Sequence, residues 1–148
     1  MYQRLVYVSQ ASPGVAARDT YDIIRVAVNR NSQLGLTGAL LFLDGHFIQL
    51  LEGQPHQVEA RFKRIAADAR HSSLSLRQTL RTSELLFPAD WMALRSEQQI
   101  APGVKQAFAY QPGLPATQFD PDRIVSFLLA CCGRAASASA GQPTLAAG

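Results

Sequence analysis

The segment GALLFLDGHFIQLLEG, residues 38–53, decides the fold. It contains two apolar runs, residues 38–43 and 46–51, each of strand length, with the dipeptide Asp44-Gly45 between them. An Asp-Gly pair favours the two-residue turn of a β-hairpin, because both residues tolerate the positive φ that this turn requires. The segment therefore predicts two neighbouring antiparallel strands, and the rest of the chain can be placed around them.

On the amino-terminal side, residues 4–9 (RLVYVS) predict a first strand. Side chains alternate between the two faces of a strand, so Leu5 and Tyr7 share one face and Val6 and Val8 share the other. All four are apolar or aromatic, and Ser9 lies on the face of Leu5 and Tyr7.

A helix is predicted between this strand and the hairpin. It begins near Asp19 or Thr20, either of which is a competent N-cap, and ends at Leu34-Gly35. The stripe that faces inward contains residues spaced four apart: Ile23, Ala27 and Asn31. Asn31 stands near the end of the helix, where asparagine is common as a cap, and its amide could equally contact a ligand.

The chain after the hairpin predicts a second helix over residues 55–70, a fourth strand over residues 74–80 and a short fifth strand over residues 91–94. The apolar stripe of that helix is Val58, Phe62, Ile65 and Ala69. The element order is then β-α-β-β-α-β-β. This order predicts an α+β fold of the ferredoxin-like β-α-β-β-α-β type with an additional fifth strand, two helices on one sheet face, and C-terminal helices.

We expect residues 1–98 to form the main domain and residues 99–133 to form a C-terminal helical extension. The segment DPDRIVSFLLACCG, residues 120–133, predicts a helix with Asp120 as N-cap, Pro121 at its first position and Gly133 as its stop. Its apolar residues cover more than one stripe, so an uncovered patch and a homo-oligomer are expected. Residues 134–148 have no charge after Arg134 and no pattern, and are expected to be disordered.

Composition limits the class of protein. The chain has 148 residues, 47% of them hydrophobic and 17% charged, with a net charge of +3. No apolar run approaches the roughly 20 residues that cross a bilayer, and the start lacks the pattern of a signal peptide. Cationic residues are scattered. These features predict a cytoplasmic globular protein without a membrane or nucleic-acid partner.

The sequence gives no support for an enzyme or a metal site. The phosphate-binding, hydrolase and zinc-protease motifs are absent. His46, His56 and His71 have no ligand spacing with one another or with Cys131 and Cys132, so no metal is expected. A small acylphosphatase-like enzyme is an alternative for a ferredoxin-like fold. It needs Arg and Asn in an anion-binding loop, and residues 11–15 contain neither.

Gln49 is the most informative residue, because it places an amide in the apolar third strand, on the face of Phe47 and Leu51. A buried amide without partners costs about 1–3 kcal/mol, so it must meet a polar group inside. Tyr7 is the natural partner, since it also lies on an apolar strand and needs a partner for its hydroxyl. Such a bond could serve a ligand site or simply close a core.

Four polar residues end the predicted second helix. Arg64 and Asp68 are four residues apart and could form a surface ion pair of about 0.3–0.5 kcal/mol. Arg70 and His71 would place cations at the helix C-terminus, where they suit the helix dipole. All four therefore have a structural explanation that requires no ligand.

Several segments together resemble the BLUF family of flavin photoreceptors. They are RLVYVSQ, NSQLGLTGALLF, FIQLLEG and RIAADARHSSL, in this order and with similar spacing over roughly residues 3–98. The stretch FDPDRIVSFLL also resembles the helical extension of short, single-domain members. The resemblance implies a ferredoxin-like fold and a flavin held non-covalently between the two helices.

The resemblance also implies roles for individual residues. Tyr7 and Gln49 match the photoactive tyrosine and glutamine. Met92 keeps the family's position near the strand that switches, whereas Trp91 is displaced, because the family separates the Trp and Met that are adjacent here. Ala27 stands where the family often has serine. The residues that match flavin contacts are Ile23, Asn31, Gln49, Arg64, Ile65, Asp68, Arg70 and His71.

A blue-light sensor is the function that this resemblance implies, with FAD as cofactor and FMN as the alternative. Electron and proton transfer from Tyr7 would leave Gln49 rotated or tautomerised and the absorption shifted to the red. The protein would signal by protein–protein interaction with an unknown downstream protein, and not as an enzyme. A flavin-free interaction module of the same fold remains the other alternative.

Overall fold

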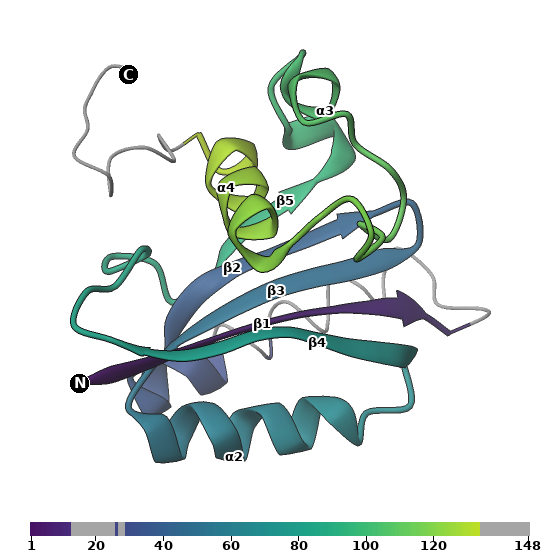
Figure 1. Ribbon diagram of the computed structural model, residues 1–148. Coiled ribbons are helices and arrows are strands. Elements are labelled where there is room, and N and C mark those ends of the chain that lie inside the picture. Colours follow the sequence, from purple (N-terminus) through teal and green to yellow (C-terminus); the bar gives the residue numbers. More distant parts are fainter. Residues whose placement is uncertain (13–25, 27–28, 134–148) are drawn as a thin grey trace.

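A five-stranded sheet forms the centre of the protein in a computed structural model that describes residues 1–12, 26 and 29–133. The strand order is β4-β1-β3-β2-β5, and all neighbours are antiparallel except the parallel pair β2–β5. This is the predicted ferredoxin-like order with a fifth strand at the β2 edge (Figure 1). The strands are β1 Tyr2–Ala11, β2 Thr37–Leu43, β3 His46–Gly53, β4 His71–Thr82 and β5 Ala93–Ser96.

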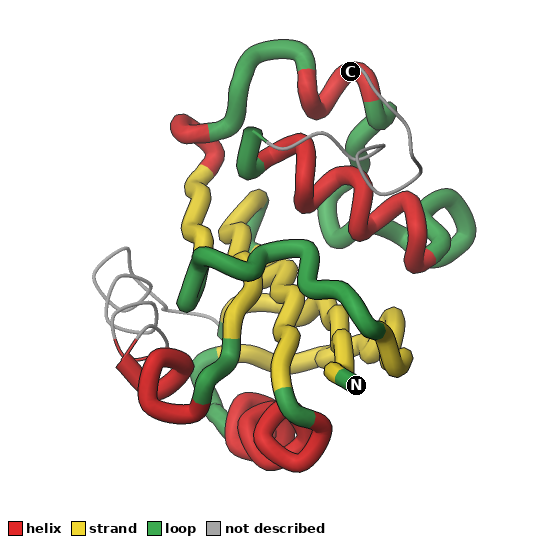
Figure 2. Tube along the Cα trace, turned by 90° about the vertical axis from the view of Figure 1, so that its left-hand side faces the viewer, coloured by secondary structure: helices red, strands yellow, loops and turns green. Residues whose placement is uncertain are grey.

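Helices cover both faces of the sheet. Helix α2 (Pro55–Ala66) lies on one face, and the helix α4 (Pro121–Cys131) lies on the other (Figure 1). Residues 29–34 are also helical and lie beside α2 (Figure 2). Two short elements, η1 (Glu97–Gln99) and α3 (Val104–Ala107), connect β5 to α4. The sheet therefore separates two apolar cores, one under each helical layer.

The Asp44-Gly45 turn forms as predicted. Asp44 has φ 49° and Gly45 has φ 74°, the positive values of a type I′ turn. The turn sets the register of β2 against β3, so that Phe42 pairs with Phe47 and Leu40 pairs with Gln49.

Strand β1 lies between β4 and β3, inside the sheet. Its residues alternate as predicted, with Leu5 and Tyr7 in the core on the α2 side and Val6 and Val8 in the core on the α4 side. Because both faces are covered, a one-residue slip of this strand would exchange the two sets. The register of β1 is therefore strongly specified.

Three predicted boundaries are wrong. Helix α2 ends at Ala66 and not at residue 70, and β4 already begins at His71. Arg70 and His71 therefore precede and begin a strand, and they do not cap a helix C-terminus. The fifth strand begins at Ala93, so Trp91 and Met92 lie in the connection before it and not within it.

Helix α4 has the predicted caps but not the predicted exposed patch. The Asp120 carboxylate accepts from the Arg123 backbone N–H at 2.8 Å, and Gly133 has φ 75°. The apolar side chains of the helix are buried within this chain: Ile124, Phe127, Leu128, Leu129 and Cys131. Both of its apolar surfaces are used internally, so the argument for self-association through this helix is wrong.

Replacing Gly38 by alanine tests the packing at the centre of the sheet. A Cβ at Gly38, which has φ 153°, would lie 1.9 Å from the Leu50 carbonyl oxygen. We expect Gly38→Ala to lower the free energy of unfolding by about 2 kcal/mol or more. Gly35→Ala is the control, since Gly35 has φ 70° with open space around its Cβ, and should cost about 1 kcal/mol. Equal losses of unfolding free energy in the two variants, measured by urea unfolding, would contradict the close approach of Gly38 to Leu50.

Candidate functional site

Tyr7 and Gln49 are paired across β1 and β3, at directly opposed positions of the antiparallel ladder. The Tyr7 hydroxyl donates to Gln49 Oε1 at 2.5 Å, and both side chains are only 3% exposed. Burial raises the pKa of the Tyr7 phenol, an effect opposed in part by the nearby Arg61. The phenol is therefore neutral and acts as a hydrogen-bond donor, and the predicted partnership is present.

The nitrogen of the Gln49 amide contacts Met92. Gln49 Nε2 donates to Met92 Sδ at 3.6 Å, and Met92 is buried. Oxygen and nitrogen of a carboxamide occupy nearly the same volume, so a half-turn of this group would present Nε2 to Tyr7 and Oε1 to Met92. The amide therefore has two alternative arrangements with different hydrogen bonds.

A pocket opens beside this pair, on the α2 side of the sheet. Its apolar walls come from β2, β3 and helical segments, and its polar groups come from β1, β3, α2 and the α2–β4 connection. The described residues that line it are Tyr7, Val26, Leu40, Phe47, Gln49, Arg61, Arg64, Ile65, Asp68, Arg70 and His71. The structure thus brings together six of the predicted flavin-contact residues with Tyr7.

Asp68 and Arg70 form the ion pair of this pocket, which corrects the predicted pairing of Arg64 with Asp68. The Arg70 guanidinium contacts both Asp68 oxygens, with the shortest distance 2.6 Å, and the Arg70 backbone N–H also donates to Asp68. These bonds lower the pKa of the Asp68 carboxyl to about 2. Since α2 ends at Ala66, Asp68 is outside the helix and cannot make the four-residue pair.

His71 joins three elements at the rim. Its Nε2 lies 2.6 Å from the Ile65 carbonyl oxygen, and its Nδ1 lies 2.7 Å from Ser9 Oγ. A carbonyl can only accept, so Nε2 carries the hydrogen that bonds to Ile65. His71 thereby fixes the end of α2 against β1 and β4, and its ring meets Tyr7 and Phe47 edge-on.

Asn31 is fully buried beside the connection that leads to β5. Its Nδ2 donates to the Trp91 carbonyl oxygen at 2.9 Å. Its Oδ1 is buried without a hydrogen-bond partner among the described residues, so this oxygen is an acceptor available to a ligand donor. Trp91 itself is 46% exposed, and Ile23 and Ala27 lie outside the described residues.

Sequence reasoning missed four residues of the lining: Val26, Leu40, Phe47 and Arg61. Three of them had a usable signal. Leu40 pairs with Gln49 across the hairpin, Phe47 is two residues from Gln49 on the same face, and Arg61 is four residues before Ile65 in α2. Arg61 Nε is buried without a partner among the described residues, and burial, then the nearby Arg30, lowers the pKa of its guanidinium.

A flavin fits the chemistry of this pocket. Its flat ring suits the apolar walls of Ile65, Leu40 and Phe47, and its polar edge suits the buried amide of Gln49. Asn31, with its unpartnered Oδ1, is not among the residues that line the pocket. Within the described ranges no group of three His, Cys, Asp or Glu could hold a metal ion. The same ranges contain no helix long and apolar enough to span a bilayer.

Comparisons with known proteins identify the family. Residues 2–93 match the family model "BLUF: Sensors of blue-light using FAD". Photoactivated adenylate cyclase subunit beta of Euglena gracilis is 36% identical over 87 residues, which is 59% of this chain and 10% of that relative. The blue light- and temperature-regulated antirepressor BluF of Escherichia coli is 35% identical over 74 residues, 50% of this chain and 18% of that relative.

Solved structures of similar proteins cover more of the chain. The ground state of BlsA superimposes with a TM-score of 0.76 at 25% identity, covering 89% of this chain and 88% of that one. The dark state of the BLUF protein BlrB gives a TM-score of 0.66 at 28% identity, covering 75% and 86%. With the family model matched over residues 2–93, the chain belongs to the BLUF family of blue-light sensors that use FAD.

Proposed function

We propose that this chain senses blue light through a flavin held beside Tyr7 and Gln49, and that the flavin is FAD. The observation that carries the proposal is the buried Tyr7–Gln49 hydrogen bond at the wall of the pocket. Arg61 and Arg64 on the α2 wall add positive charge that suits the phosphates of a nucleotide tail. FMN would use the same groups with one phosphate fewer.

A flavin supplies the absorption of blue light and, when excited, a strong one-electron oxidant. Tyr7 is the nearby donor, because its phenol is neutral and holds a proton in a short bond to Gln49. Loss of an electron makes a phenol strongly acidic, so the proton has a path to Gln49 and can return by the same path. Tyr7 thus supplies both the electron and the proton.

Gln49 converts this transfer into a change of contacts. After rotation or tautomerisation its amide would present different groups to Tyr7 and to Met92, and would change the hydrogen bond that it offers to a flavin held in the pocket. Each bond contributes about 1 kcal/mol net, which can bias a two-state element without unfolding the domain. Met92 lies directly before β5, so the altered amide would act first on that strand.

The downstream step is a protein–protein interaction with a partner that the residues do not identify. Relatives place a matching domain beside other activities, as the names adenylate cyclase and antirepressor indicate. This chain spans only about a tenth of the Euglena relatives, so their activities are not transferred to it. The location in the cytoplasm also remains a proposal.

The first test removes the phenol. Tyr7→Phe keeps the ring but not the donor to Gln49, so the variant should retain its flavin and lose the reversible red shift. Tyr2→Phe on the same strand is the control, since Tyr2 lies outside the pocket lining. Light-minus-dark absorption spectra of both proteins decide the matter. A full red shift in Tyr7→Phe would exclude Tyr7 as the donor.

The second test removes the Gln49 amide, which receives the proton from Tyr7 in the proposed mechanism. Gln49→Leu has similar volume without the amide and should bind flavin but fail to photoconvert. Gln3→Leu is the matched control, because Gln3 is also a buried amide and bonds to Thr79, away from the pocket. Photoconversion with normal amplitude in Gln49→Leu would show that the relay does not pass through this residue.

The third test concerns retention of the flavin. Asp68 orients Arg70 at the pocket, so Asp68→Ala should raise the flavin dissociation constant about fivefold, which is the effect of one ordinary hydrogen bond of about 1 kcal/mol. The free energy of unfolding should change little, because the Asp68 side chain is 32% exposed and an ion pair in contact with water contributes little. Glu59→Ala, on the exposed part of α2, is the control. Equal dissociation constants for both variants would show that the Asp68–Arg70 ion pair does not contribute to flavin binding.

A further inference from the structure

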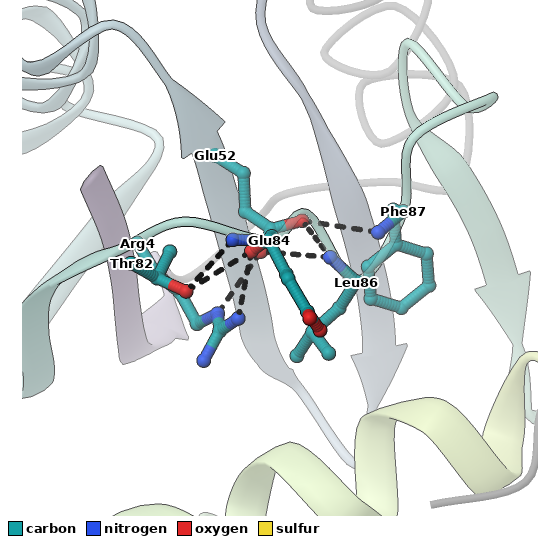
Figure 3. Close-up of polar contacts among 6 residues, drawn as sticks. All are labelled: Arg4, Glu52, Thr82, Glu84, Leu86 and Phe87. Carbon is teal, nitrogen blue, oxygen red and sulfur yellow. Dashed lines mark hydrogen bonds and ion pairs between the residues drawn. The ribbon is translucent and has the colours of Figure 1, made fainter. Parts of the chain in front are cut away.

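Glu52 is a buried carboxylate that the photochemistry does not use. It lies on β3, three residues after Gln49, and is fully buried. Because the spacing is odd, Glu52 points to the α4 face of the sheet, whereas Gln49 points to the pocket face. Figure 3 shows it between Arg4 and the connection that joins β4 to β5.

The Glu52 carboxylate accepts hydrogen bonds from three donor groups. Glu52 Oε1 accepts from the backbone N–H groups of Leu86 and Phe87 at 2.8 and 3.0 Å. Glu52 Oε2 accepts from the same Leu86 N–H at 3.0 Å and from Arg4 Nε at 3.0 Å. A buried charge is tolerated only when it is paired and hydrogen-bonded. The partners here are one guanidinium and the backbone of the β4–β5 connection.

The connection leads to Gln49, which lies at the pocket wall. Phe87 is fully buried in the core on the α4 side, and five residues later Met92 contacts Gln49 on the other side. Between them the Asp90 carbonyl oxygen accepts from the Gly38 N–H at 3.1 Å. The Trp91 carbonyl oxygen accepts from Asn31. The connection therefore crosses the edge of the sheet and is attached at each end to β3.

We propose that Glu52 is a positioning residue that sets the location of Met92 against Gln49. The two end attachments are on β3, so one strand sets the distance from the Leu86–Phe87 anchor to the Met92 contact, while the Gly38 and Asn31 bonds hold the middle of the connection. The proposal rests on the proposed function in one respect: the position of Met92 would set the rate at which the Gln49 amide returns to its dark arrangement after illumination. The positioning itself is a property of the dark protein.

The experiment compares two neutral residues at position 52 in a background without the buried cation. In Arg4→Leu, the variant Glu52→Gln keeps an oxygen that can accept from Leu86 and Phe87, whereas Glu52→Leu removes it. We expect dark recovery of the Glu52→Leu protein to be about fivefold faster than that of the Glu52→Gln protein, which corresponds to about 1 kcal/mol. Thr79→Val, which removes the bond from Gln3, should leave the recovery rate unchanged.

A second measurement separates this proposal from the photochemistry. The chain has two methionines, so labelling the methionine methyl groups with ¹³C gives one signal for Met92 and one for the exposed Met1. In the dark, flavin-loaded protein the Met92 signal should move or broaden with Glu52→Leu and keep its position with Glu52→Gln. Failure of the wild type to photoconvert would refute the proposed function and leave this result interpretable.

Glu52→Asp covers the case in which Glu52→Leu does not fold. It keeps the charge beside Arg4 but withdraws the carboxylate by one methylene, so the anchor weakens while the ion pair can persist. The same displacement of the Met92 signal supports the proposal. An unchanged Met92 signal and an unchanged recovery rate, in Glu52→Leu compared with Glu52→Gln or in Glu52→Asp with Arg4 retained compared with the wild type, would show that Glu52 has only a structural role.

Discussion

The buried hydrogen bond between Tyr7 and Gln49 is the interaction on which the rest of this structure depends. It exists because β1 and β3 are neighbours in a register that places the two residues directly opposite each other on the pocket face. A slip by one residue would send one of them to the α4 face and leave a buried polar group unsatisfied. The alternation in β1 holds that register, and the Asp44-Gly45 turn and the close approach at Gly38 fix β3 against β2 on its other side.

The same strand serves both sides of the sheet. Gln49 faces a pocket with a flat apolar wall and a polar edge, and Glu52 faces the layer that contains α4. The β4–β5 connection touches both, through Leu86 and Phe87 on one side and Met92 on the other. A change in the Gln49 amide is therefore next to the segment that joins the pocket to the opposite layer, which gives a photochemical event a short structural route outward.

The sequence predicts local patterns well and contacts between exposed side chains poorly. The hairpin, the two faces of β1, the buried Gln49 and the caps of α4 each follow from a strong local rule, and all are present. The partner of Asp68 depended on whether the helix continued past Ala66, which weak propensities in the segment before β4 could not settle. The apolar residues of α4 were visible, but their cover comes from the sheet and from the segment before the helix, which sequence spacing does not show. Ile23 lies outside the described residues, so its predicted contact with the flavin stays a prediction.

One measurement tests the central claim most directly: the light-minus-dark absorption spectrum of the purified, flavin-loaded wild-type protein. The geometry of Tyr7 and Gln49 predicts a small shift of the flavin absorption to the red under blue light, without bleaching, that reverses fully in the dark. A protein that binds no flavin, or one whose flavin spectrum is the same before and after illumination, would contradict the account.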